Sequence, residues 1–146
     1  MKKKWLLIGA GVLLLALLLA FCIWWFTPTV FLKDVNPADV ARIEVFNGTT
    51  GERFAIENSA DIEYIVRKIG DVRLQNKEWE QVDGFAYSLS FWAADGTCIE
   101  QFMLNGDDRI RDGYLEYEQM YETEEDPLCF KYIKNLEESQ RNYPTQ

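Results

Sequence analysis

The longest apolar stretch of the chain is an uncharged run from Trp5 to Phe26. As an α-helix, its 22 residues would extend about 33 Å, enough to cross a hydrocarbon core of about 30 Å. Tryptophans stand at both ends of the run, where their amphipathic rings suit the membrane interface. The pattern predicts that residues 1–26 comprise cytoplasmic lysines followed by a transmembrane helix.

The charges that flank this run indicate its orientation. Lys2, Lys3 and Lys4 precede it, and the first acidic residue is Asp34. Because positively charged flanks stay in the cytoplasm, the N-terminus is expected there and the chain beyond Phe26 is expected outside. We therefore expect a single-pass protein of the cell membrane with an extracytoplasmic C-terminal domain.

Two alternatives to an uncleaved anchor stay open. A cleaved signal peptide has an apolar stretch of about 7–15 residues and a small-residue cleavage site, whereas this run is longer and ends in bulky side chains. Lipidation at Cys22 is the other alternative, although Phe21 stands where a lipoprotein signal has a small residue. The length of the run favours the uncleaved anchor.

The remaining chain divides by composition into three parts. Residues 27–37 contain two prolines and no clear periodicity, which predicts a short linker. Residues 38–138 are long enough for one extracytoplasmic domain. Residues 139–146 are polar and are expected to form a frayed tail.

The domain begins with a predicted β-hairpin. Val40 to Ile56 alternates like two strands, with Asn47-Gly48 at the turn. Asn-Gly supplies the positive φ angles that tight hairpin turns require. Residues 47–49 also form a glycosylation acceptor sequence, but the motif is short and common, so we favour the turn.

A helix is predicted from Ser59 to Ile69. Asn58 or Ser59 can cap its first amides, and Gly70 is expected to end it as a C-terminal cap. Its apolar residues recur at i, i+3, i+4 and i+7 and form one stripe that must cover another surface. They are Ile62, Ile65, Val66 and Ile69.

The following residues alternate like strands of an antiparallel sheet. Val72 to Asn76 is a short candidate, and Phe85 to Trp92 alternates most clearly. One face of that second strand is predicted to carry Phe85, Tyr87, Leu89 and Phe91. Asp-Gly or Asn-Gly dipeptides at 95–96, 105–106 and 112–113 then predict a meander of strands at 98–104, 109–111 and 114–117.

Asp126-Pro127 is predicted to open a final helix whose inner stripe contains Cys129, Tyr132, Ile133 and Leu136. The chain beyond the membrane segment therefore reads ββα-ββββ-α. This order predicts an α+β domain, in which one antiparallel meander sheet carries its helices on one face.

Charge and composition exclude several functions. The chain has 15 bases, 24 acids and no histidine. Since three bases precede residue 5, residues 27–146 carry 12 bases against 24 acids, which argues against nucleic-acid binding. The lack of histidine removes His-dependent catalysis and His-metal sites, and no SxxK or GxSxG motif is present. We expect a protein that is not an enzyme and that holds no cofactor.

Two clusters of acids are candidates for a divalent cation site, because carboxylate oxygens suit Ca²⁺. They follow no EF-hand spacing, so a solvated acidic loop is favoured over a metal site. The candidate residues are Asp107, Asp108, Asp112, Glu122, Glu124, Glu125 and Asp126.

Three other side chains carry possible roles. Cys98 and Cys129 could form a disulfide outside the cytoplasm, or both could be small buried residues. Trp79 stands in a polar stretch, where an indole is either an interaction anchor or packs against the sheet edge.

The chain loosely resembles small membrane-anchored or lipoprotein-type domains of unknown function from Gram-positive bacteria. The resemblance lies in the segments Lys2 to Phe26, Ile43 to Phe54 and Gly84 to Phe102. It implies no activity and no site residues.

The sequence therefore favours a non-catalytic extracytoplasmic domain that binds another envelope protein. One alternative is a membrane-tethered inhibitor or immunity-type protein, whose acidic surface would suit a basic attacker. Another is a module that responds to divalent cations through the acidic residues named above.

Overall fold

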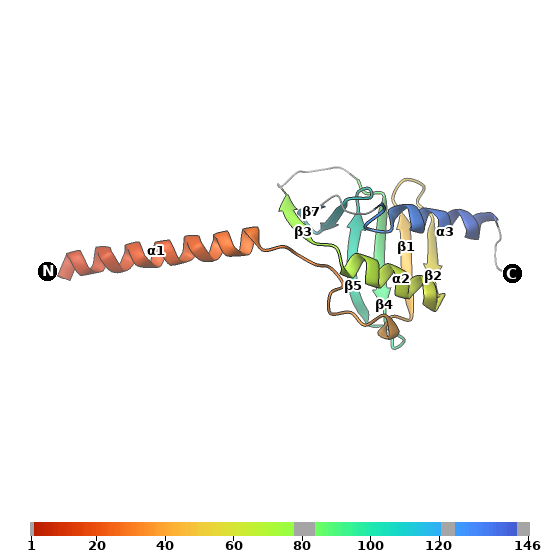
Figure 1. Cartoon of the computed structure of the whole chain (residues 1–146), viewed down its shortest axis with the longest axis horizontal. Coiled ribbons are helices and arrows are strands. Elements are labelled where there is room, and N and C mark those ends of the chain that lie inside the picture. The colour runs from red at the N-terminus through yellow and green to blue at the C-terminus, as the bar shows by residue number, and fades with distance from the viewer. Residues whose placement is uncertain (1, 78–83, 121–124, 143–146) are drawn as a thin grey trace.

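The computed structural model describes residues 2–77, 84–120 and 125–142. Its helices are α1 (Lys2–Phe26), α2 (Ser59–Gly70) and α3 (Phe130–Asn142), with a short 3₁₀-helix, η1 (Pro37–Asp39). The strands, shown with the helices in Figure 1, are β1 (Arg42–Asn47), β2 (Arg53–Ile56), β3 (Leu74–Lys77), β4 (Tyr87–Trp92), β5 (Cys98–Leu104), β6 (Arg109–Asp112) and β7 (Leu115–Gln119).

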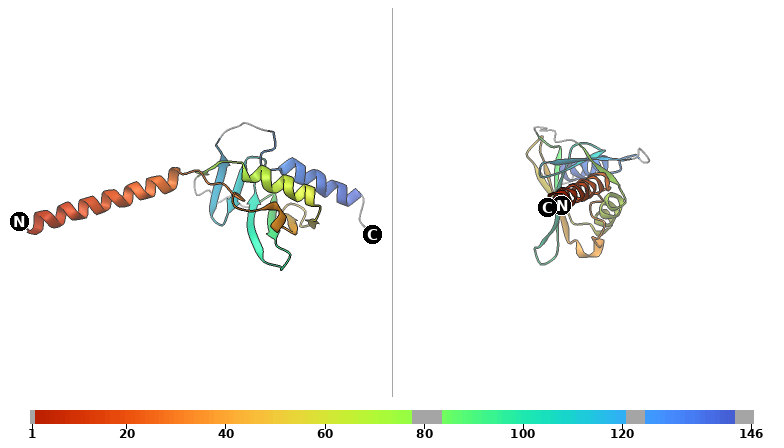
Figure 2. Two further views of the ribbon diagram at one scale, coloured as in Figure 1. Left: turned by 60° about the horizontal axis from the view of Figure 1, so that its bottom comes forward. Right: turned by 90° about the vertical axis from the view of Figure 1, so that its left-hand side faces the viewer.

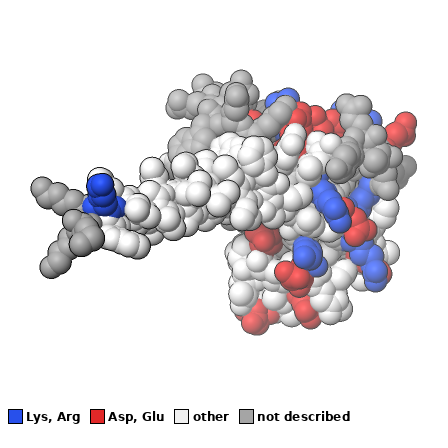
Figure 3. Space-filling model, turned by 60° about the vertical axis from the view of Figure 1, so that its left-hand side comes forward, with Lys and Arg blue, Asp and Glu red and all other residues white. Residues whose placement is uncertain are grey.

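The N-terminal apolar run forms one continuous helix that projects away from the rest of the protein (Figure 1). Residues Leu7–Phe26 are long and apolar enough to cross a membrane, and none of this stretch is buried inside the protein. In Figure 3 the uncharged surface of α1 separates the basic N-terminal end from the charged domain. An exposed apolar helix of this length is compatible with a membrane anchor.

The domain contains one seven-stranded antiparallel sheet, in the order β2-β1-β4-β5-β6-β7-β3. Strands β4 to β7 form the predicted meander. The predicted order ββα-ββββ-α is one strand short, because the short candidate at Val72 to Asn76 does form a strand, β3 (Leu74–Lys77), which lies at the far edge beside β7. A simple meander is also wrong for the whole sheet, since β1 pairs with β4 and α2 carries the chain from one edge to the other.

The two long helices of the domain, α2 and α3, cover the same face of the sheet, as predicted (Figures 1 and 2). The Asn58 side chain caps α2 by accepting hydrogen bonds from the amides of Ala60 and Asp61. The apolar stripe of α2 packs against the inward residues of the strands and excludes water. This core includes Ile43, Val45, Ile62, Ile65, Val66, Ile69, Leu89, Phe91, Phe102, Leu104 and Ile110.

Part of the segment expected to be a linker is built into the domain. Thr29 and Leu74 exchange backbone hydrogen bonds of 2.7 and 2.9 Å, which adds a bridge outside β3. Phe31 and Leu32 are 7% and 4% exposed and belong to the core. The two prolines and the lack of periodicity in residues 27–37 therefore reflect an irregular segment that is packed into the domain.

Gly70 has a different role from the one its position suggested. It is the last residue of α2, and the chain continues through Asp71 in the right-handed helical region, so Gly70 does not serve as a left-handed cap. A Cβ on Gly70 would lie 3.4 Å from the carbonyl oxygen of Leu32. The end of α2 therefore packs against the 31–32 segment at a distance that would also accommodate a Cβ in ordinary van der Waals contact.

The final helix begins later and ends later than predicted. Asp126 adopts φ 55°, and its carboxylate accepts hydrogen bonds from the amides of Lys131 and Tyr132 at 2.8 and 2.9 Å. Asp126 thus caps α3 from a turn that precedes it, and Pro127 is not in the first turn. The helix continues to Asn142, so residues 139–142 are helical rather than frayed.

The hairpin between β1 and β2 is confirmed, but its turn works differently. The positive φ belongs to Gly51, at 76°, and not to Asn47-Gly48. The Asn47 side-chain oxygen instead accepts hydrogen bonds from the amides of Thr49 and Thr50, at 2.9 and 3.1 Å. Asn47 therefore shapes the turn through its side chain, as Asx turns do.

Candidate functional site

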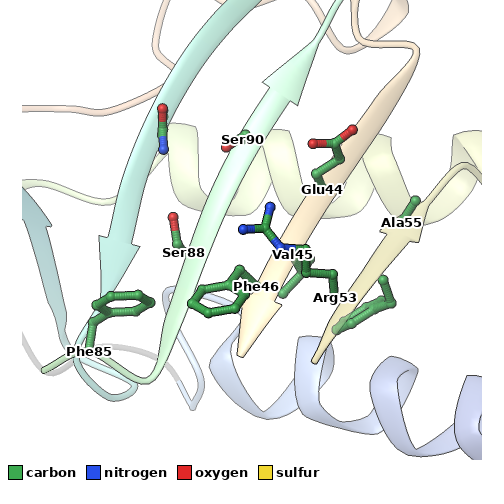
Figure 4. A pocket seen from close by; sticks show the side chains of 10 residues that line it. Glu44, Val45, Phe46, Arg53, Ala55, Phe85, Ser88 and Ser90 are labelled. Atoms are coloured by element: carbon green, nitrogen blue, oxygen red, sulfur yellow. The ribbon is translucent and has the colours of Figure 1, made fainter. Parts of the chain in front are cut away.

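The face of the sheet opposite α2 and α3 has a hollow of about 470 Å³ over strands β1, β2, β4 and β5 (Figure 4). Its floor contains Ser88 and Ser90, two small outward residues of β4. The larger residues beside them come from β1 and β5, since Phe46 pairs with Ser88 and Ser90 pairs with both Glu44 and Gln101. Small side chains on a central strand between larger neighbours create the depression.

Aromatic rings form one end of the hollow. The rings of Phe46 and Phe85 lie 5.9 Å apart between centroids. Phe85 was expected on the inner face with Tyr87, and this prediction is wrong. Because regular pairing starts only at Tyr87 and Gly84 turns the chain with φ 100°, the alternation does not extend back to residue 85.

Gly48 allows Phe85 to reach this position. A Cβ on Gly48 would collide with the carbonyl oxygen of Phe85 and lie 3.0 Å from two of its ring carbons. The glycine of the Asn-Gly pair is therefore needed for a close approach between two chain segments, not for a positive φ.

Two arginines lie over aromatic rings on the same face. The guanidinium of Arg53 is 4.8 Å from the centre of the Phe46 ring, and that of Arg42 is 5.5 Å from the Trp92 ring. Arg42 also bonds Glu44, with nitrogen–oxygen distances of 3.0 Å. Within residues 2–77, 84–120 and 125–142, Arg53 has no ion pair.

The other half of this face, over β6 and β7, carries charged side chains that contact one another. Arg109 lies 3.6 Å from Glu118, 4.0 Å from Glu116 and 3.9 Å from Asp108. Glu116 is 5% exposed and accepts a 3.3 Å hydrogen bond from the side-chain amide of Asn105. Glu116 and Glu118 are therefore both in contact with neighbouring polar groups.

A second polar cluster lies inside the domain, where Glu137 of α3 meets the sheet. Its carboxylate accepts hydrogen bonds from Tyr87 at 2.7 Å and from Asn47 at 2.9 and 3.2 Å. Burial and this hydrogen bond to Glu137 raise the pKa of Tyr87. Sequence reasoning missed Glu137, although its place four residues after Ile133 puts it on the inner stripe of the helix.

This cluster includes Asn47, the asparagine of the glycosylation acceptor sequence. The Asn47 side-chain nitrogen is the atom that a glycan would occupy, and it already donates to Glu137. Asn47 is also only 8% exposed. The preference for the turn over glycosylation agrees with this burial.

The cysteines are held apart as free thiols. Cys98 is exposed at the start of β5, whereas Cys129 is fully buried before α3, so the structure does not join them in a disulfide. Burial raises the pKa of the Cys129 thiol to about 12. Cys22 is exposed on the surface of α1.

The acidic candidates for a cation site are engaged elsewhere or fall outside the described residues. Asp107 lies 3.9 Å from Lys131, Asp108 lies near Arg109, and Asp126 caps α3. Among residues 2–77, 84–120 and 125–142, no three acids or cysteines are grouped so that they could hold a metal ion. Asp112 and Glu125 belong to no such group, and the predictions for Glu122, Glu124 and Trp79 lie outside these residues.

No family model, no curated protein and no solved structure matches this chain.

Proposed function

We propose that this chain is a single-pass membrane protein whose extracytoplasmic domain binds another envelope protein without catalysis. The observation that carries the proposal is the open sheet face, where a hollow of about 470 Å³ combines aromatic and charged side chains. Antiparallel sheets often leave one face in water, but that face then carries mainly polar residues. Phe46, Phe85 and Trp92 are an unusual set for such a face, because aromatic residues and arginine are enriched where proteins meet.

The connection between α1 and the domain supports a position at the membrane surface. Only Thr27 and Pro28 lie between the end of α1 and Thr29, which pairs with β3. The three Cα–Cα links from Phe26 to Thr29 span about 11 Å at most, so the domain cannot move far from the lipid. In Figure 1 the β3 edge lies nearest α1, and the strands of the hollow lie farther along the sheet. A partner would therefore reach the hollow on the part of the domain that lies away from α1.

The edges of the sheet are less suited to partner binding than its face. Gln140 of α3 donates a 2.9 Å hydrogen bond to the carbonyl of Ala55 on edge strand β2. At the opposite edge, Thr29 occupies part of β3. Because exposed strand edges are the usual site of strand addition, this cover favours binding through side chains of the open face.

A photo-cross-linking amino acid placed at Gln101 tests the proposal in the full-length protein in its native membrane. Gln101 is exposed and lines the hollow, and Lys134 on the outer side of α3 is the matched exposed control. We expect one dominant protein to be cross-linked from position 101 and much less of it from position 134. Equal labelling from both positions, or none from position 101, would contradict the proposal.

A further inference from the structure

Among the residues that the structure describes, Arg53 is the charged side chain of the hollow that lacks an ion pair. The acids that share the open face are held by other groups, Glu44 by Arg42 and Glu118 by Arg109. Arg53 instead lies 4.8 Å above the ring of Phe46, with no carboxylate within 4.0 Å among the described residues. This is unexpected in a domain with twice as many acids as bases.

The position of Arg53 makes its guanidinium available to a ligand. Figure 4 shows the side chain reaching from β2 across β1 toward Ser88 and Ser90. A guanidinium that stacks on a ring keeps its edge free, and its planar array of N–H donors matches both oxygens of a carboxylate. The serine hydroxyls supply further donors beside it.

The aromatic end of the hollow favours a ligand that also carries an apolar group. Phe46 stands next to the guanidinium, Phe85 lies beside Phe46, and both rings face the hollow on the side of the sheet opposite α2 and α3. A volume of about 470 Å³ holds a few side chains rather than a whole domain surface. The hollow therefore combines one carboxylate-binding group with one apolar wall.

We propose that this hollow binds an acidic segment of the partner protein, in which an Asp or Glu side chain pairs with Arg53 and a neighbouring large apolar side chain packs against Phe46 and Phe85. The proposal rests on the function proposed above and specifies the partner's chemistry. The net negative charge of the domain does not oppose it strongly, because exposed charges farther than about 8 Å are screened at physiological salt.

Peptide selection on the full-length protein in lipid nanodiscs tests this chemistry directly. The probe is a phage-displayed library of random heptapeptides, with empty nanodiscs for counter-selection. We expect enriched sequences to share an acidic residue next to a large apolar residue. The best peptide is then synthesised with blocked ends, together with a copy that carries Gln or Asn in place of the acid. The amide copy should bind at least about tenfold more weakly, since a hydrogen bond to a charged group is lost.

Variants of the protein test whether the selected peptide binds in the hollow. Arg53→Gln should weaken the acidic peptide at least about tenfold and affect the amide copy little. Arg67→Gln is the matched control, because Arg67 is an exposed arginine on α2 that pairs with Glu63 at 2.8 Å. Ser90→Leu, which fills the hollow while keeping Arg53, should weaken both peptides. The seven arginine Nε–H signals in an NMR spectrum should show the Arg53 signal shifting most on binding.

The results separate this proposal from the function on which it rests. A selection that yields no peptides, peptides with no shared acid, or binding that survives Arg53→Gln would overturn the ligand chemistry. If position 101 still cross-links to one partner, the proposed function stands and only its chemistry is wrong. If cross-linking from position 101 also fails, both proposals fall.

Discussion

The hydroxyl of Tyr87 on β4 lies 2.7 Å from Oε2 of Glu137 on α3 and donates a hydrogen bond to it. Asn47, at the end of β1, donates to the same carboxylate. Arg141, one turn later on α3, lies 3.4 Å from Glu137 and also pairs with Glu52 beside β2. One buried acid therefore joins the last helix to the part of the sheet that lies beneath the hollow.

Replacing Glu137 should lower the free energy of unfolding by more than the loss of one charge would. Glu137→Ala leaves the Tyr87 hydroxyl and the Asn47 amide buried without a partner, and we expect a loss of about 2–4 kcal/mol in the free energy of unfolding. Tyr87→Phe leaves the other partners of Glu137 and should cost about 1–2 kcal/mol. Urea unfolding of the full chain in mild detergent measures both. Glu138→Ala, at the exposed neighbouring position, should stay within about 0.5 kcal/mol.

The buried thiol of Cys129 should make the domain sensitive to alkali. Its pKa rises from 9.0 to about 12 on folding, because the charged thiolate would be desolvated. Below pH 9 both states hold the proton, and between pH 9 and 12 only the folded state does, so stability falls as the pH rises through this window. Because one proton is involved, the unfolding free energy should fall by about 1.4 kcal/mol per pH unit within this window.

The unfolding free energy of Cys129→Ala, measured between pH 8 and 11, tests whether this thiol causes the loss of stability as the pH rises. The unfolding free energy of Cys129→Ala should fall less steeply with pH than that of the wild type, by about 1.4 kcal/mol per pH unit. Cys98→Ala should show the pH dependence of the wild type. Tyr132 adds to the loss above pH 10, because its 2.6 Å hydrogen bond to Asp61 raises the pKa of Tyr132 to about 12. A Cys129→Ala curve parallel to that of the wild type would show that this thiol is not the cause.

Gly48→Ala should change the shape of the hollow by displacing Phe85. The new Cβ would meet the Phe85 carbonyl oxygen, which belongs to the backbone, so we expect a loss of about 1–3 kcal/mol in stability and displacement of Phe85. Gly51→Ala is a useful comparison, since it has φ 76° but open space around it, and its cost of about 1–2 kcal/mol should come from backbone strain alone. NMR shifts of the Phe46 ring should change in the first variant and not in the second.

Phe31→Ala tests whether the segment after α1 belongs to the domain. The ring of Phe31 lies 5.3 Å from those of both Phe102 and Tyr117, and its removal should cost about 3–4 kcal/mol. Lys33→Ala, an exposed change in the same segment, should have little effect. Equal stability of the two variants would mean that residues 27–37 act only as a linker.

Cys98 offers a direct test of the proposed topology. As an exposed thiol on β5, it should react with a membrane-impermeant maleimide on intact cells, whereas the buried Cys129 should not react without denaturant. Cys98→Ala should abolish the labelling. Reaction only after the cells are permeabilised would place the domain on the cytoplasmic side and overturn the proposed orientation.

The elements with one strong periodic signal were predictable from the sequence. The α2 stripe, the β1–β2 hairpin and the β4–β7 meander follow from local spacing and turn residues, because each depends on contacts between near neighbours in the chain. The length and apolarity of α1 follow from the sequence in the same way.

What the sequence could not determine depends on contacts between distant segments. Nothing near Phe31 or Leu74 reveals that the segment after α1 meets β3, or that β1 lies beside β4. Gly48 looked like a turn residue, but it gives space to the backbone of Phe85, and Gly70 ends α2 without serving as a left-handed cap. The hollow likewise needs β1, β2, β4 and β5 to be aligned before Arg53 and Phe85 come together. Local sequence fixes the periodicity of a segment, whereas sheet order and register arise only when the whole core is buried at once.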